Sequence, residues 1–370
     1  MRPLAFLIAW FASACTAAHA SASAPAPSAP ALPEPELLLS LSFELSTEPG
    51  NRAAVVGRLQ RTQLFTAGDS LDITQRVSDL RREMIAKYAA PTTWMRFNAV
   101  SHELRLGEYR QFITSEKRLA TAQAAYRNFW MRQTAAGLVG AGWGAEVLRI
   151  DSSGTLAPYL AEFVSREGRT SRAVPILGLW SYDRRTGEAL LPSGHFDQVA
   201  LEWGSPIGNT TYVKADVVHE SHWQFAPRWS AGFSVSAGAI RGTGGHLTPI
   251  GKRYYGGGVG SVRGYEGGSL GPIDSSGASM GADRKLAGNA EVLWHAFDIG
   301  PTPIILSGFG DHGTFYRAEG STIDKESAGA YGLGISVPMP FGLVRFSFAD
   351  PRRDTGRTQR FQFDARASWR

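Results

Sequence analysis

Few residues in this chain have the types and spacing of a metal site, a phosphate-binding loop or a catalytic site. The nearest approach to a metal site is His219-Glu220-Ser221-His222, in which two histidines have no third ligand at a matching spacing. Gly245 stands one residue too far from Gly251-Lys252 for a phosphate-binding loop, and no strand-to-helix pattern surrounds it. No combination of serine, histidine and aspartate has a supporting context either. We therefore expect neither catalysis nor a bound metal or cofactor.

A glycine-rich stretch from Tyr254 to Glu266 has a different character. It contains Gly256-Gly257-Gly258 and then Val262-Arg263-Gly264-Tyr265, with one arginine between a valine and a glycine. Consecutive glycines can adopt positive φ and approach other backbone closely, because they have no Cβ. We expect this loop to run through a crowded part of the fold. Taken alone, the Val-Arg-Gly-Tyr pattern also fits an ordinary exposed turn.

Most of the remaining chain has a period of two. From Trp229 to Ala237 every second residue is apolar, and the residues between are serine or glycine. The last segment shows the same alternation, with one face made of Phe361, Phe363, Ala365, Ala367 and Trp369. Such alternation places the apolar side chains on one side of a β-strand. The pattern predicts an all-β protein.

The N-terminus reads as an export signal followed by a tether. Residues 1–20 combine Arg2, the apolar run Leu4–Ala12 and a small-residue cleavage pattern, Ala18-His19-Ala20. Residues 21–37 are rich in proline, alanine and serine, a composition that stays extended and buries no core. The single cysteine, Cys15, falls within the signal. We expect an exported chain without disulfides.

Many alternating strands fit either a soluble sandwich or barrel or a transmembrane barrel, and three features favour the membrane. The chain carries an export signal, tryptophans fall at the expected strand ends, and the last strand ends in an aromatic residue. No apolar run of 18 residues follows the signal, so the crossing elements must be strands of a closed barrel.

We expect an antiparallel transmembrane β-barrel over residues 38–370, with 16 strands. The expected strands are 38–47, 52–65, 68–79, 81–93, 94–107, 114–127, 134–150, 173–184, 195–204, 209–220, 227–240, 284–297, 302–316, 326–338, 341–350 and 358–369. Residues 156–167 are expected to form a short helix or a strand extension within an external loop.

The overall charge fits a membrane setting. The mean hydropathy of −0.16 is typical of a barrel whose polar face lines a lumen, and the net charge is +5. Outside the cytoplasm a basic excess favours anionic lipid headgroups as neighbours. Stacking aromatics are not interleaved with the lysines and arginines, so we expect no nucleic-acid partner.

The glycine-rich loop and the strands after it resemble the bacterial surface-antigen barrel of the BamA/TamA/FhaC superfamily. The similar features are Tyr-Tyr-Gly-Gly-Gly, Val-Arg-Gly-Tyr, Gly271-Pro272 and three tail segments, Ser327-Ala328-Gly329, Pro340–Val344 and Phe361–Phe363. The resemblance is clear over residues 173–370 and is one of pattern over 38–150.

This resemblance implies a role for the arginine. In that family the sixth external loop folds back into the lumen, and its arginine meets acidic side chains on the next two strands. The matching acids here are Glu291 and Asp311. Loop 242–283 would then plug the lumen. The implied loop lock consists of Val262, Arg263, Gly264, Tyr265, Glu291 and Asp311, with Gly256, Gly257 and Gly258 as loop glycines. An arginine inside a lumen also needs carboxylate partners on physical grounds.

The resemblance also implies a function. Such barrels insert or translocate other membrane proteins, and their first and last strands pair weakly at a seam that opens. Here the seam would join Leu39–Ser46 to Phe361–Trp369, with seam residues Leu41, Phe43, Phe361, Phe363 and Trp369. Two departures stand out: no POTRA domain is recognised before the barrel, and Arg366 stands near the position of a glycine that kinks the last strand in family insertases.

We therefore expect a barrel of the bacterial outer membrane that assists membrane-protein assembly or protein translocation through a gated seam or pore. Its expected partners are lipids, including anionic headgroups, client outer-membrane or exported proteins, and a separate periplasmic protein that the tether could contact. The alternative is a passive plugged channel, or a structural or surface-antigen barrel without transport activity.

Overall fold

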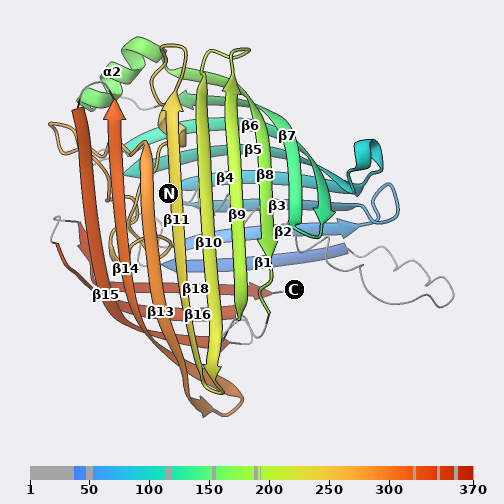
Figure 1. The fold of residues 1–370 in the computed structure, drawn as a ribbon, viewed down its shortest axis with the longest axis vertical. Helices are drawn as coiled ribbons and strands as arrows, with labels where there is room; N and C mark the ends of the chain where they lie inside the picture. Colours follow the sequence, from blue (N-terminus) through green and yellow to red (C-terminus); the bar gives the residue numbers. More distant parts are fainter. Residues whose placement is uncertain are drawn as a thin grey trace.

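The alternating segments of the chain form antiparallel strands that close into a barrel (Figure 1). The computed structural model describes residues 37–46, 53–112, 118–151, 156–186, 191, 193–319, 322–339, 342–353 and 357–369. Residues 1–36, which hold the expected signal peptide and nearly all of the tether, lie outside this part. None of the helices within it is long and apolar enough to cross a membrane.

Sixteen strands of the described chain make the wall, and each neighbouring pair is antiparallel. In chain order they are β1 (Leu37–Ser46), β2 (Ala53–Thr62), β3 (Ser70–Ser78), β4 (Arg81–Pro91), β5 (Ala99–Phe112), β6 (Arg118–Thr134), β7 (Gly137–Ile150), β8 (Thr170–Asp183), β9 (Gly194–Ser205), β10 (Tyr212–Ala226), β11 (Trp229–Gly242), β13 (Arg284–Ile299), β14 (Thr302–Glu319), β15 (Thr322–Met339), β16 (Gly342–Pro351) and β18 (Phe361–Trp369). Two further short strands, β12 (Gly264–Tyr265) and β17 (Thr358–Gln359), pair with each other.

The expected fold is confirmed, although some strand limits were wrong. The segment expected at 94–107 begins only at Ala99, because Trp94–Arg96 form a 3-10 turn in which Met95 and Arg96 have positive φ. The segment expected at 114–127 continues to Thr134, because the alternating buried face continues through Phe129 and Met131. The ambiguous stretch before Arg169 forms the helix α2 (Pro158–Glu167), with proline in its first turn.

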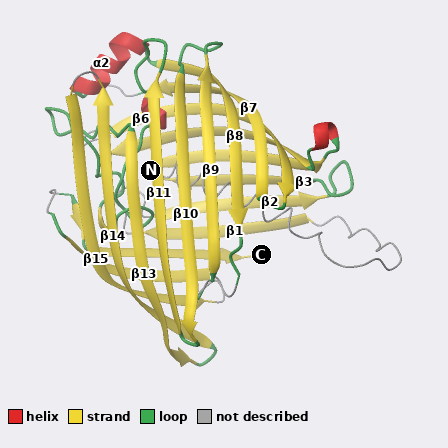
Figure 2. Ribbon diagram, in the orientation of Figure 1, coloured by secondary structure: helices red, strands yellow, loops and turns green. Residues whose placement is uncertain are grey.

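The alternation divides the wall into two faces. On β10, Tyr212, Lys214 and Asp216 are buried, whereas Val213 and Val217 are exposed. The exposed apolar face therefore meets lipid and the polar face meets the lumen. β11 and β13 lie side by side in the wall (Figure 2), and Trp229, the first residue of β11, stacks on its register partner Trp294 of β13 with ring centroids 5.3 Å apart. This pair contributes to an interfacial aromatic belt.

The two ends of the barrel differ in the length of their connections. At one end lie the segment that carries α2, the long segment 243–283 between β11 and β13, and the segment between β16 and β18 that carries β17 (Figure 1). The other end has short connections such as 135–136, 227–228 and 300–301, and it also holds the start of β1 and the end of β18. Because bacterial barrels have short periplasmic turns and longer external loops, the α2 end is the external one.

The barrel closes through the shortest of its described ladders. In the described chain β1 and β18 share six residue pairs, from Leu41↔Trp369 to Ser46↔Asp364. The ladder between β14 and β15 has fifteen pairs and that between β10 and β11 has fourteen. Fewer paired residues mean fewer backbone hydrogen bonds to break. Among the described ladders of the wall the β1–β18 seam is the shortest, one pair shorter than the β16–β18 ladder.

Candidate functional site

The segment 243–283 between β11 and β13 lies within the barrel and forms much of its core. Val262, Tyr265, Leu270 and Ala282 are completely buried. They belong to one apolar cluster with inward-facing wall residues, including Phe309 and Phe315 of β14, Ala328 and Ala330 of β15, and Ala349 of β16. We call this segment the luminal loop.

Arg263 attaches the luminal loop to two strands of the wall. Its Nε and Nη2 donate to the two carboxylate oxygens of Asp311 on β14, each at 2.8 Å, and its backbone N–H donates to Asp311 at 2.9 Å. Its Nη1 donates to Glu291 on β13 at 3.3 Å. The guanidinium lies 3.4 Å from the ring centroid of Phe309. Both charges of the main pair are removed from water, since the Asp311 side chain has no exposed surface and that of Arg263 is 6% exposed.

The glycines of the luminal loop are required by close contacts. A Cβ on Gly256 would lie 2.0 Å from the Phe315 ring, and one on Gly257 would lie 2.2 Å from the Glu266 carbonyl oxygen. Gly257, Gly258 and Gly264 also have positive φ, which favours glycine. The backbone next to Arg263 can therefore approach the wall closely enough for the guanidinium to reach Asp311.

Tyr265 connects the luminal loop to the last strands. Its hydroxyl donates to the carbonyl oxygen of Gly329 at 3.2 Å, and its own carbonyl oxygen accepts from Gln362 on β18 at 3.1 Å. The short strand β12, which contains Tyr265, pairs with β17 just before β18. The luminal loop thus holds the chain immediately before the seam, a contact that the sequence did not reveal.

Lys252 forms a second anchor on another part of the wall. This residue ends the 3-10 turn Ile250–Lys252, and its Nζ contacts Glu146 on β7 at 2.6 Å and Glu202 on β9 at 2.5 Å. Arg127 on β6 also pairs with Glu146, and the Tyr212 hydroxyl donates to Glu202. Next to this cluster, Tyr254 donates to Asp216 on β10 at 2.9 Å. Sequence reasoning missed this cluster.

The tip of the luminal loop contacts helix α2. Asp274 accepts hydrogen bonds from the Ser276 and Ala278 backbone N–H groups at 2.8 and 3.0 Å, and its other oxygen accepts from Tyr159 in the first turn of α2. Desolvation raises the pKa of Asp274, but these hydrogen bonds outweigh it and hold the pKa below its usual value. Nearby, Arg253 donates to the carbonyl oxygens of Thr248 and Met280 and lies 5.8 Å from the Phe163 ring centroid.

The expected seam residues fall into two groups. Leu41 pairs with Trp369, and Phe43 pairs with Ala367, so these positions lie in the β1–β18 ladder. The side chains of Phe43 and Trp369 lie outside the described residues. In the described chain, Phe361 and Phe363 pair with Phe348 and Phe346 of β16, and Phe363 packs on Phe346 with centroids 5.0 Å apart.

Comparison with known proteins identifies the barrel. Residues 64–369 match a family model described as the Omp85 superfamily domain. Outer membrane protein assembly factor BamA of Neisseria meningitidis is 28% identical over an alignment of 271 residues, and the match covers 59% of this chain and 32% of that protein. BamA of Nitratidesulfovibrio vulgaris is 31% identical over 169 residues, 43% of this chain and 21% of that protein. This chain spans a third or less of these curated relatives.

Solved structures agree on the fold. A structure of BamA from Haemophilus ducreyi lacking POTRA domains 1-3 has a TM-score of 0.79 and 14% identity, and the match covers 90% of this chain and 70% of that one. CdiB from Escherichia coli has a TM-score of 0.63 and 12% identity, with 92% of this chain and 64% of that one covered. Identities this low establish similarity of fold alone.

The Arg263 anchor predicts a large loss of stability on truncation. Arg263→Ala leaves the Asp311 carboxylate buried without its cation, so we expect the free energy of unfolding to fall by about 3–5 kcal/mol. Arg263→Lys should recover only part of this, because an ammonium cannot reproduce the two parallel hydrogen bonds. Urea unfolding of the refolded barrel in detergent, followed by tryptophan fluorescence, measures both variants.

The matched control for this measurement is Arg149→Ala. Arg149 forms an ion pair with Asp151 at 2.9 Å, and its side chain is 69% exposed. We expect a change of at most about 1 kcal/mol there. Equal losses in Arg149→Ala and Arg263→Ala would contradict a dominant role for the buried pair.

The two anchors should act on different parts of the luminal loop. Lys252→Met leaves Glu202 without its cation, so amide hydrogen exchange should increase over residues 248–256 and remain near wild type over 261–266. Adding Glu202→Gln removes the uncompensated charge and should restore part of the protection. If exchange rises uniformly across the loop in Lys252→Met, the anchors act as one unit and the idea of two independent anchors is wrong.

Proposed function

This chain belongs to the Omp85 superfamily and forms a β-barrel of the bacterial outer membrane, and on that premise we propose that it assists outer-membrane protein assembly by opening between β1 and β18. The curated relatives named above are outer membrane protein assembly factors, which supports an assembly role for this barrel. Translocation of exported proteins through the same seam or lumen is the closely related form of this activity.

The observation that carries the proposal is the short seam. Six residue pairs join β1 to β18, whereas β1 makes nine pairs with β2, so β1 leaves β18 more readily than β2. Separation would expose the backbone donors and acceptors of two strand edges in the membrane. An incoming strand satisfies them by pairing, which is β-augmentation. The seam would therefore serve as a template for the first strand of a client barrel.

The luminal loop would control which side of the seam moves. Gln362 and the β12–β17 pair attach the beginning of β18 to Tyr265, and Arg263 holds that part of the loop on β13 and β14. In this mechanism β18 remains with the anchored wall and β1 moves outward with β2. The loop lock of Arg263, Glu291 and Asp311 has no catalytic part; it keeps one edge of the opening in place.

Residues 1–36 would contribute to this function through export and attachment. Residues 1–20 would direct export and be removed, and residues 21–36 would link the barrel to the periplasm. We propose that a separate periplasmic protein delivers unfolded clients and contacts this proline-rich tether. Extended proline-rich segments suit such contacts because little conformational entropy remains to be lost on binding.

The second candidate function is a passive barrel, and the two anchors favour it. The luminal loop is attached to β7, β9 and β10 through Lys252 and Tyr254 and to β13 and β14 through Arg263. A loop fastened across the lumen in this way would make an effective permanent plug. In that case the seam never opens, and the barrel acts as a structural element or surface antigen.

A disulfide across the seam distinguishes the two functions. Ser42 and Ser368 are paired across β1 and β18, and antiparallel partners lie within disulfide range. We expect Ser42→Cys with Ser368→Cys, in a Cys15→Ser background, to form a disulfide in native membranes. The oxidised protein should lose its ability to crosslink to unfolded outer-membrane clients and should regain it on reduction.

The control carries the same bond elsewhere in the wall. Ala215 and Ala239 are partners in the β10–β11 ladder, so Ala215→Cys with Ala239→Cys locks a pair of strands that the mechanism leaves closed. This control should retain client crosslinking when oxidised. Full client crosslinking by the seam-locked barrel would reject lateral opening and favour the passive barrel.

A further inference from the structure

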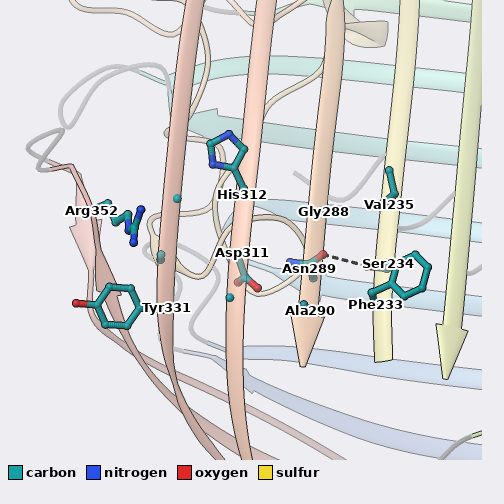
Figure 3. A pocket seen from close by; sticks show the side chains of 13 residues that line it. Phe233, Ser234, Val235, Gly288, Asn289, Ala290, Asp311, His312, Tyr331 and Arg352 are labelled. Carbon is teal, nitrogen blue, oxygen red and sulfur yellow. Dashed lines mark hydrogen bonds between the residues drawn. The ribbon is translucent and has the colours of Figure 1, made fainter. Parts of the chain in front are cut away.

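A groove of 480 Å³ crosses the outer face of the wall where β11, β13, β14 and β15 lie side by side (Figure 3). Its volume is within the range of about 300–1,000 Å³ typical of small-molecule sites. One side is formed by Phe233 and Val235 of β11, which are each 38% exposed. The other side is formed by Tyr331 of β15, which is 53% exposed. The groove is open toward the lipid.

Small residues form the floor of this groove, which we call the outer groove. Gly288 and Ala290 of β13 and Gly310 of β14 point outward in it. A Cβ built on Gly310 meets no atom within 4 Å, so the space over this residue is empty. The wall needs no glycine here for its own packing. Most of the lining surface between Phe233 and Tyr331 is apolar, with His312 and Arg352 as polar members, and such a space suits an acyl chain.

Cationic side chains stand beyond the external end of the groove. Arg284 of β13 pairs in register with Tyr316 of β14, and Tyr316 pairs with Lys325 of β15. Arg284 and Lys325 are exposed, and the Lys325 ammonium lies 5.5 Å from the Tyr316 ring centroid. Tyr316 of this row lies four residues after His312, a residue of the groove lining on the same strand. The row is therefore roughly 13 Å closer to the external end than His312.

Two further polar groups lie beside the groove. Arg352, which lines it, is exposed and has its guanidinium carbon 5.9 Å from the Tyr331 ring centroid. The carboxylate of Asp350 accepts a hydrogen bond from the Tyr331 hydroxyl at 2.9 Å and lies 3.7 Å from Arg360. Asp350 is therefore engaged with its own neighbours, and the external end of the outer groove is cationic.

We propose that the outer groove binds one acyl chain of a phosphorylated lipid of the outer leaflet, whose phosphate group is held by Arg284 and Lys325. The occupant follows from the position of the site. The apolar groove lies at acyl-chain depth, and the cations lie nearer the external surface, where the phosphates of that leaflet are found. The inference rests on the outer-membrane location of the barrel and is independent of seam opening.

The position of this lipid links it to the luminal loop. The backbone of Asp311 lines the outer groove, while its side chain points inward to Arg263. Phe309 on the same strand also faces inward, below the guanidinium. The bound acyl chain and the loop lock therefore lie on opposite sides of one layer of backbone. Occupancy of the groove would stiffen the strands that hold Arg263.

Native mass spectrometry of the purified full-length barrel in detergent tests the proposal. The probes are diphosphorylated lipid A and, for comparison, zwitterionic phosphatidylethanolamine. Wild type should retain one lipid A in preference to phosphatidylethanolamine. Gly310→Leu fills the groove and should lower lipid A affinity about tenfold, and Arg284→Gln with Lys325→Gln should do the same by removing two cations.

Matched controls keep the result specific. Gly178 on β8 is another wall glycine, near the exposed Ile176 and Leu201, and its Cβ would make only an ordinary 3.8 Å contact with Leu201. Gly178→Leu and Arg149→Gln should bind lipid A as wild type does. If Gly310→Leu fails to fold, judged by heat-dependent mobility, Ala290→Leu fills the same groove from β13. Equal binding by groove variants and controls, or no preference for lipid A, would mean ordinary annular lipid and overturn the proposal.

Discussion

The structure depends on one buried ion pair, that between Arg263 and Asp311. A guanidinium and a carboxylate taken out of water are tolerated only when each satisfies the other. Here the planar fork of Arg263 matches both oxygens of Asp311, Glu291 takes a remaining donor, and the Phe309 ring lies against the cation. The glycines that precede the motif, and Gly264 within it, allow the backbone to come this close. Without the pair, the part of the loop around residues 261–266 would lose its main attachment to β13 and β14.

The loop is held on two parts of the wall, and this gives the barrel unequal halves. Lys252 and Tyr254 attach it to β7, β9 and β10, and Arg263 and Tyr265 attach it to β13, β14, β15 and β18. Each of these anchors joins a loop residue to side chains or backbone of a strand far away in sequence. The luminal loop therefore connects strands between β7 and β18 to one another across the lumen.

The sequence predicted the wall strands and the partners of Arg263, for identifiable reasons. Period-two alternation is a local signal, so all sixteen wall strands could be located, although strand limits such as those of β5 and β6 differed from expectation. At β5 the cause is the local backbone conformation of Met95 and Arg96. Arg263, Glu291 and Asp311 could be grouped because a family pattern names them in order. The Lys252, Glu146 and Glu202 cluster has no such pattern, and its members meet only once the register of β7, β9 and the loop is known. The same holds for Gln362 and Tyr265.

The unequal bracing bears on how a barrel of this kind could open. The N-terminal wall has ion pairs between neighbouring strands, such as Arg58 of β2 with Asp72 of β3 and Arg105 of β5 with Glu83 of β4, and these pairs do not reach across the lumen. A sheet held by ion pairs between neighbouring strands can rotate as one body. A sheet whose strands are also bonded to a loop in the lumen is held in place. Because the seam lies where these two kinds of wall meet, separation would move β1 and the strands after it, and β18 would remain with the loop. The loop lock would then be a fixed support for gating, and the wall from β1 onward would be the moving part.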